Sequence, residues 1–159
     1  MKKTDFRKVE IGSNKFYIYP FSALKAANLS GELVKLLAPA LGSLGAAIDA
    51  KNVDKLLDSD VRDLAPALSG AFGSLSGDAL ETLLRKLLII NENVAYDNAE
   101  GKTVRLSEED LDTLFCGEVQ DMYLLAFEVI RTNYGGFFEK LGSRFGNASA
   151  PSTTTAATV

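Results

Sequence analysis

Apolar residues recur at helical spacing over most of the chain and predict three long helical segments. In the first, which begins at Ala23, the apolar positions are Leu29, Leu33, Leu36, Leu37, Ala40, Leu41, Leu44 and Ile48. This 3.6-residue period is typical of a helix that buries one face. Pro39 cannot donate a hydrogen bond inside a helix, so we expect either a kinked helix or two helices that meet near Ala38.

The second helical segment follows a Gly- and Ser-rich stretch, residues 69–77, which predicts a loop. Its apolar face consists of Leu80, Leu83, Leu84, Leu87 and Leu88. Asp78 and Glu81 have the spacing of a capping box, so we expect this helix to begin there. A further helix start is predicted at Ser107, because acidic residues follow it at the positive end of the helix dipole.

The third long segment keeps helical register over more than 25 residues near the end of the chain. Its stripe comprises Val119, Met122, Tyr123, Ala126, Ile130, Tyr134, Phe137, Phe138, Leu141 and Phe145. Between Met122 and Ile130 only Glu128 is charged, which is typical of a helix at the centre of a core or covered by another chain. The pair Gly135-Gly136 predicts a bend.

Strand-forming residues are concentrated in two places. Residues 6–11 and 15–19, joined by Gly12-Ser13-Asn14, predict a β-hairpin with a three-residue loop. Residues 94–96 and 103–106 are compatible with a second small hairpin. We therefore predict a mainly α fold: a helical domain with a short N-terminal hairpin at residues 5–19 and, near 94–106, a second small one.

Composition indicates one globular domain that remains in a reducing compartment. The chain has 159 residues, of which 47% are hydrophobic and 24% charged. Residues 1–146 are predicted to form a single domain, and residues 147–159, which hold only small and polar side chains apart from a final valine, a disordered tail. The longest apolar stretch, residues 33–48, is too short to span a bilayer, and no apolar leader follows Met1.

The residues that usually carry chemistry are missing or scattered. The chain has no histidine, which removes the commonest general base and metal ligand. Its one cysteine, Cys116, follows Phe115 on an apolar patch and is predicted to be a buried, inert thiol. Acidic residues at 58–63 lack the glycine and the terminal glutamate of a calcium loop. We expect no enzyme activity, no cofactor and no metal.

Charge is distributed unevenly along the chain. The formal net charge of −4 argues against a nucleic-acid partner, which favours a basic surface. Residues 1–25 hold six basic and two acidic side chains, whereas residues 92–121 hold nine acidic and two basic ones. These segments are either two separately solvated surfaces or complementary surfaces through which subunits form a homo-oligomer.

Four sequence blocks carry a resemblance to a known family. They are Phe16-Tyr17-Ile18-Tyr19-Pro20-Phe21, Leu36-Leu37-Ala38-Pro39, Leu114-Phe115-Cys116-Gly117-Glu118, and the run Val129-Ile130-Arg131-Thr132-Asn133-Tyr134-Gly135-Gly136-Phe137-Phe138. In this order, over residues 16–145, the chain resembles the phage tail assembly chaperones. Two positions depart from the family pattern, because Tyr134 stands in place of Phe and Gly136 in place of an acidic residue.

The resemblance implies a helical, non-enzymatic protein of the host cytoplasm. Such chaperones bind the tape-measure protein, keep it soluble, help to recruit tail-tube subunits and are absent from the finished virion. A structural subunit of a phage tail or head-completion complex is the alternative, and an enzyme or nucleic-acid binder is a third class. Aromatic residues in the last helix are the candidate protein-binding positions: Phe127, Tyr134, Phe137, Phe138 and Phe145. Their alternative role is to close the domain's own core.

Overall fold

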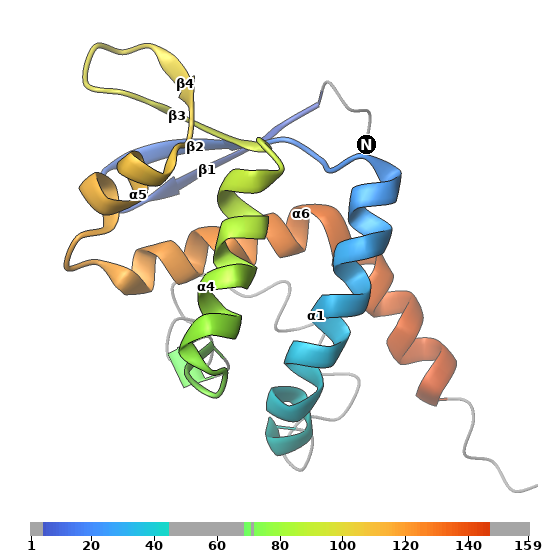
Figure 1. Cartoon of the computed structure of the whole chain (residues 1–159). Coiled ribbons are helices and arrows are strands. Elements are labelled where there is room, and N and C mark those ends of the chain that lie inside the picture. Colours follow the sequence, from blue (N-terminus) through green and yellow to red (C-terminus); the bar gives the residue numbers. More distant parts are fainter. Residues whose placement is uncertain (1–4, 45–68, 71, 147–159) are drawn as a thin grey trace, which may run out of the picture.

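A computed structural model describes residues 5–44, 69–70 and 72–146, with side chains for residues 5–33, 69–70 and 72–135. Its elements follow the order β1, β2, α1, α4, η2, β3, β4, α5 and α6 (Figure 1). The predicted tail at residues 147–159 and the acidic residues at 58–63 lie outside the described residues.

The four strands form one antiparallel sheet in the order β1-β2-β3-β4. The strands are β1 (Arg7–Ile11), β2 (Asn14–Ile18), β3 (Val94–Asp97) and β4 (Thr103–Arg105). The first hairpin turns at Gly12, whose φ of 59° is in the region that favours glycine, and Ile11 pairs with Asn14. Its loop therefore has two residues, and the predicted three-residue loop is wrong.

The mainly α prediction is also wrong, because the two hairpins are joined into a single sheet. Phe16 of β2 lies opposite Tyr96 of β3, and Ile18 lies opposite Val94. Each hairpin alone would expose an apolar face, whereas together they bury it against the helices. The protein is an α+β domain with a four-stranded sheet as one of its layers.

The helices are α1 (Ala23–Leu44), α4 (Gly77–Arg85), α5 (Glu108–Phe115) and α6 (Val119–Gly146), with a π-helical turn η2 (Lys86–Ile90) directly after α4. Helix α1 continues through Pro39 as one element, so the alternative of two helices is wrong. Helix α4 is capped by Ser76, whose hydroxyl accepts from the Ala79 amide, and not by the predicted Asp78 box. Figure 1 shows α6 changing direction between its orange first half and its red second half.

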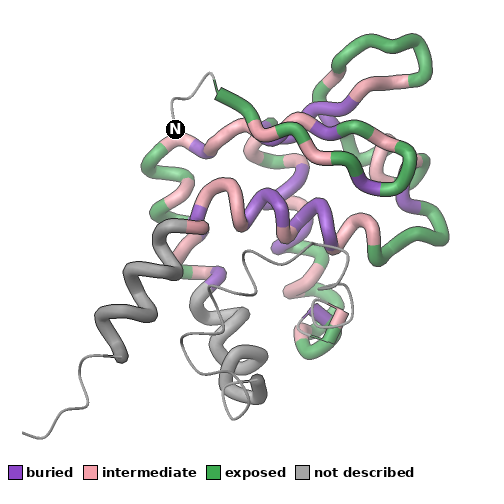
Figure 2. Tube along the Cα trace, turned by 180° about the vertical axis from the view of Figure 1, so that it is seen from behind, coloured by how far each residue is buried: buried purple, intermediate pink, exposed green. Residues whose placement is uncertain are grey.

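The core lies between the inner face of the sheet and the middle of α6. The sheet contributes Phe16, Ile18 and Val94, all fully buried. The α4–η2 segment contributes Leu83, Leu87 and Leu88, and α6 contributes Leu125, Ala126 and Val129. Figure 2 shows buried residues concentrated along the first half of α6. Of the two alternatives for residues 122–130, a place in the domain's own core is confirmed, and cover by another chain stays a prediction.

Glu128 is the one charged residue in this apolar part of α6, and its side chain is only 3% exposed. Its carboxylate lies 3.2 Å from Nε of Arg7 on β1 and 3.5 Å from Nη1 of Arg131 on α6. A buried carboxylate is tolerated when cations compensate its lost hydration. This cluster therefore connects the edge strand β1 to α6.

We expect Arg7→Ala to lower the free energy of unfolding by about 1–3 kcal/mol. The buried carboxylate of Glu128 would then keep only Arg131, at 3.5 Å, as a described ion-pair partner. Lys8→Ala is the matched control on the same strand, since Lys8 is exposed, and should change it by less than about 0.5 kcal/mol. Urea unfolding of both variants measures the difference. Equal losses for the two variants would show that the Arg7–Glu128 ion pair does not stabilise the fold.

Candidate protein-binding groove

Three helices line a groove on one side of the molecule, and each contributes one helical stripe. Helix α4 supplies Gly77, Leu80, Glu81, Leu84 and Arg85. Helix α5 supplies Glu108, Leu111, Asp112 and Phe115, and α6 begins with Val119, Met122 and Tyr123. Cys116 and Gly117, in the turn between α5 and α6, complete the lining. Because these stripes have i, i+3, i+4 spacing, the helices present their facing surfaces to a common space of about 600 Å³.

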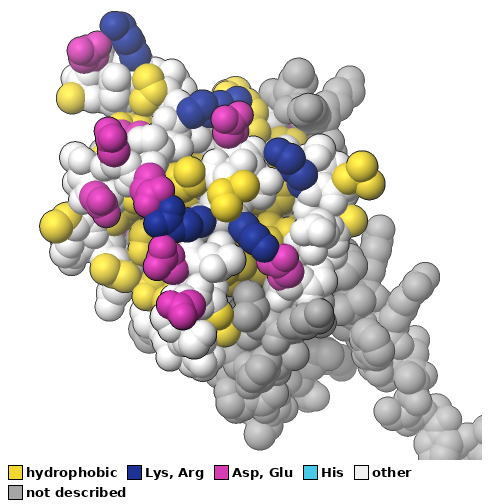
Figure 3. All heavy atoms as spheres, in the orientation of Figure 1, with side chains coloured by type: hydrophobic (Ala, Val, Ile, Leu, Met, Phe, Trp, Pro, Cys, Tyr) yellow, Lys and Arg dark blue, Asp and Glu magenta, His cyan; other side chains and the backbone are white. Residues whose placement is uncertain are grey.

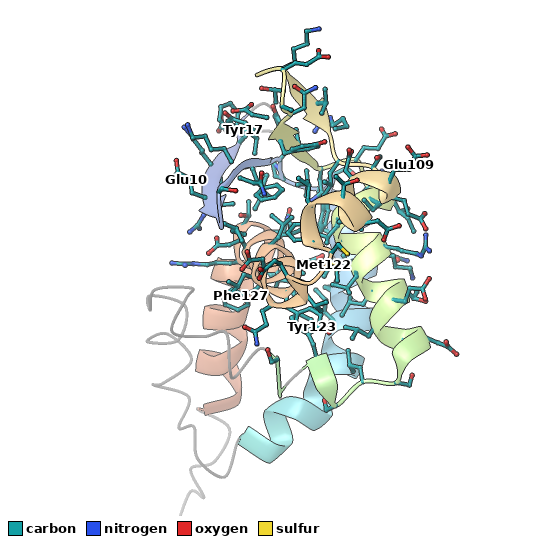
Figure 4. All side chains as sticks on the ribbon, turned by 90° about the vertical axis from the view of Figure 1, so that its left-hand side faces the viewer. Glu10, Tyr17, Glu109, Met122, Tyr123 and Phe127 are labelled. Carbon is teal, nitrogen blue, oxygen red and sulfur yellow. The ribbon has the colours of Figure 1, made fainter. Side chains whose placement is uncertain are left out.

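The groove has an apolar floor that the domain's own residues do not fully cover. Leu84 and Phe115 are buried and belong to the core, whereas Leu80, Leu111 and Met122 are half-buried and Val119 is 46% exposed. Figure 3 shows hydrophobic side chains interleaved with acidic ones over α4 and α5. In Figure 4, Met122 and Tyr123 project from the beginning of α6 near α5 and α4. The arrangement can bury apolar side chains of another protein.

The rim of the groove is acidic. Arg85 of α4 donates from Nη1 to Glu108 of α5 at 2.5 Å and from Nε to Glu81 of α4 at 2.9 Å. The hydrogen bond from Arg85 keeps the pKa of the Glu108 carboxyl below its usual value, and those same carboxylates raise the pKa of Arg85. Asp112 is exposed on the same side of α5. Arg85 thus connects α4 to α5, and carboxylates dominate the rim.

Local sequence fixes the position of α5, the acidic wall of the groove. Ser107 and Asp110 form a capping box, which confirms the helix start predicted there. The Tyr96 hydroxyl on β3 donates to Asp110 at 2.7 Å, and the Phe115 ring stacks on Phe16 at 5.9 Å. Gly117 then takes a φ of 81°, which turns the chain from α5 into α6. The sheet therefore holds α5, the acidic wall of the groove, in place.

The Tyr96–Asp110 hydrogen bond should be detectable through its pH dependence. Burial alone would raise the pKa of Asp110, but hydrogen bonds from Tyr96 and Ser107 outweigh burial and lower that pKa below its usual value. The carboxylate is thus favoured in the folded state, so the stabilisation is present at neutral pH and is lost as the pH falls through the folded-state pKa. Tyr96→Phe should cost about 1 kcal/mol of unfolding free energy at pH 7.

Denaturant unfolding of the wild type and Tyr96→Phe from pH 7 down to about pH 2 tests this expectation. The difference between the two proteins should shrink below about pH 4. A difference that stays constant over that range would show that the loss comes from packing and not from the hydrogen bond. Thr113→Val provides a control on the exposed side of α5, because its hydroxyl donates only within the helix, to the Glu109 carbonyl.

Of the five aromatic residues predicted to bind a partner, the two with described side chains, Phe127 and Tyr134, do not line the groove. Tyr134 is buried, its hydroxyl donates to the Ala26 carbonyl of α1 at 2.7 Å, and burial raises its pKa to about 12. Phe127 is half-buried on α6 and does not line the groove. Phe137, Phe138 and Phe145 lie in the second half of α6, and their side chains are outside the described part. Contact of these five residues with a partner stays a prediction.

The expectation of a buried thiol was wrong, because Cys116 is exposed. Cys116 follows Phe115, the last residue of α5, at the point where the chain leaves the helix. Its side chain lies at the border of the groove and not in the core with Phe115. Phe115 is the last residue of α5 and is buried in the core, whereas Cys116, the first residue after the helix, is exposed. Sequence reasoning treated the pair as one apolar patch.

Part of the charge asymmetry is matched within one copy of the chain. Arg7 of the basic segment pairs with Glu128. Asp97 of the acidic segment accepts hydrogen bonds from Thr103 and Tyr17, and these bonds, with the charges of Lys15 and Lys8, lower its pKa. The exposed acids of α5 have no such partners apart from Arg85 in the described part of the chain. The homo-oligomer stays a prediction.

Two other kinds of feature are absent from the described residues, a metal-ligand cluster and a helix that could span a membrane. No group of three or more histidine, cysteine, aspartate or glutamate side chains has the geometry to hold a metal ion. No helix in the described part combines the length and apolarity needed to cross a bilayer.

The chain is thus an α+β domain with an apolar, acid-rimmed groove between three of its helices. A family model described as phage tail assembly chaperone protein, TAC, matches residues 12–146. The chain therefore belongs to the phage tail assembly chaperone family, which confirms the resemblance seen in the sequence. Searches of curated proteins and of solved structures returned no match.

Proposed function

We propose that this chaperone binds the tape-measure protein of its phage, keeps that protein soluble and helps to recruit tail-tube subunits. The groove between α4, α5 and α6 is where an apolar segment of the tape-measure protein docks. The observation that carries the proposal is the half-exposed apolar floor of this groove, in a chain whose family assembles phage tails.

Docking in this groove suits a protein that must hold apolar helices apart before assembly. Long helical proteins with apolar stripes aggregate unless another surface covers those stripes. An apolar floor with a polar rim covers a stripe reversibly, because the rim keeps the free chaperone soluble. Release before completion of the virion then requires only that subunits of the tail compete for the same apolar surface.

The protein acts by binding alone, without catalysis and in the host cytoplasm. The lack of histidine in the sequence and the absence of a metal-ligand cluster among the described residues support a binding role. As an assembly factor, the chaperone is expected to be missing from purified virions. Mass spectrometry of finished particles distinguishes it from a structural tail or head-completion subunit, which would be present at a fixed copy number.

Co-expression with the tape-measure protein tests the proposal. The tape-measure protein expressed alone should be largely insoluble, and the chaperone should carry most of it into the soluble fraction as a complex that co-purifies. The same experiment with an unrelated acidic domain of similar size controls for a general effect of expression. If the wild-type chaperone leaves the tape-measure protein insoluble, the proposal is wrong.

A further inference from the structure

We propose that the groove selects an amphipathic helix whose apolar stripe is flanked by lysine or arginine. This inference deepens the proposed function and rests on it, because it names the chemistry of the segment that docks. Three kinds of observation support this inference: the charges on the rim, the secondary structure of the lining residues and the exposure of the apolar floor.

The rim supplies the charge preference. Among the described residues that line the groove, three are acidic, Glu81, Glu108 and Asp112, and one is basic, Arg85. Arg85 is already engaged by Glu81 and Glu108, so its charge is largely compensated within the chain. Asp112 takes part in no ion pair with another described residue. A docked segment with acidic flanks would face uncompensated carboxylates, whereas basic flanks would pair with them.

The lining indicates a helix as the occupant and not an extended strand. Apart from the short α5–α6 turn, the described lining residues belong to helices, and the backbone groups in the interior of each helix are bonded within that helix. An extended segment needs an open strand edge to satisfy its own backbone, and none lines this groove among the described residues. A helix satisfies its backbone internally, so it can enter the groove with its apolar side chains alone.

The floor sets the spacing of the apolar side chains that would be buried. Leu80, Leu111 and Met122 come from three different helices and surround one continuous space of about 600 Å³. A helix lying along that space would insert residues at i, i+3 or i+4, and i+7. Val119 would lose its exposure on docking.

Two synthetic helical peptides of equal length and identical leucine stripe provide the probes, one with lysine and the other with glutamate at every flanking position. Fluorescence anisotropy with the full-length chaperone measures both affinities. The lysine peptide should bind at least about tenfold more tightly at low salt, and the ratio should approach one in 1 M salt, where the screening length is about 3 Å. Equal affinities at low salt, or tighter binding of the glutamate peptide, would overturn the proposal.

Charge-reversed variants locate the effect in the groove. Glu81→Lys with Asp112→Lys should abolish or invert the preference for the lysine peptide. Glu10→Lys with Glu100→Lys makes the same change in net charge at exposed positions outside the groove and should preserve it. If the control pair changes the preference as much as the groove pair, the preference comes from the net charge of the whole protein and the proposal is wrong.

These outcomes can be separated from those of the co-expression experiment. If the wild-type chaperone keeps the tape-measure protein soluble but binds the two peptides equally, the proposed function stands and this inference is wrong. If the chaperone leaves the tape-measure protein insoluble but prefers the lysine peptide through Glu81 and Asp112, the proposed partner is wrong. The inferred charge preference of the groove then stands.

Discussion

Phe16→Ala is expected to lower the free energy of unfolding by about 3–5 kcal/mol, which is a large part of the stability of a domain of this size. Phe16 is fully buried, and its ring contacts those of Phe115 at 5.9 Å and Tyr96 at 6.3 Å. It therefore joins the two hairpins to each other and to α5. Truncation would remove apolar contact and leave a cavity at the junction of all three.

Phe6→Ala provides the matched control, because Phe6 is 50% exposed and packs on Tyr17 at the sheet's outer face. It should cost less than about 1 kcal/mol. Thermal and urea unfolding of the two variants measure both losses. A loss below about 1 kcal/mol for Phe16→Ala would contradict the pairing of β2 with β3 as the centre of the fold.

Placing acids on the groove floor is expected to abolish the solubilising activity while the fold survives. In the double variant Val119→Asp with Leu111→Asp, two carboxylates would occupy the surface that an apolar helix must cover. The soluble yield of co-expressed tape-measure protein should fall about tenfold or more. Val119 is 46% exposed and Leu111 half-buried, so the melting temperature of the isolated chaperone should fall only modestly.

The control for this experiment carries the same two substitutions elsewhere. Leu24, 85% exposed, and Ile90, 60% exposed, are large apolar residues outside the groove. Leu24→Asp with Ile90→Asp should keep the tape-measure protein soluble. If the groove pair unfolds the chaperone, Val119→Asp alone repeats the test at the more exposed position. Equal activity of groove and control variants would exclude the groove as the docking surface.

Helices and hairpins could be predicted from the sequence because their signals are local. The leucine stripes of α4 and α6 and the capping box at Ser107 depend on residues within a few positions of one another. The pairing of the two hairpins into one sheet could not be predicted from such local signals. Tyr17 and Asp97, which are hydrogen-bonded across the sheet, are 80 positions apart, and neither hairpin carries a local mark of its neighbour.

Burial was harder to predict where composition was misleading. The Gly- and Ser-rich segment around Phe72 predicted a loop, yet Phe72 is among the most deeply buried residues and its ring lies 5.1 Å from that of Tyr123. Phe72, together with Leu75, which packs against the core, anchors a segment whose other residues are small or polar. Periodicity cannot detect so short a pattern, because two apolar residues do not establish a period.

The groove was only partly visible in the sequence. Leu80, Met122 and Tyr123 were recognised as apolar positions of helical stripes, but which of them the domain would leave uncovered depends on how α4, α5 and α6 meet. A signal was present in α5, where acids and apolar residues alternate on one helical stripe, at Glu108, Leu111, Asp112 and Phe115. Such a mixed stripe is typical of the border of a binding surface and not of a core.

Site-specific crosslinking from the single native cysteine tests the central claim most directly. Cys116 is exposed at the border of the groove, so a short photoreactive group attached to its thiol samples whatever occupies that groove. In the purified complex with the tape-measure protein, we expect crosslinks to helical segments with a regular apolar stripe. Lys15→Cys in a Cys116→Ser background places the same group on β2, outside the groove, and should give few crosslinks. A stable complex that crosslinks from position 15 and not from position 116 would contradict the account.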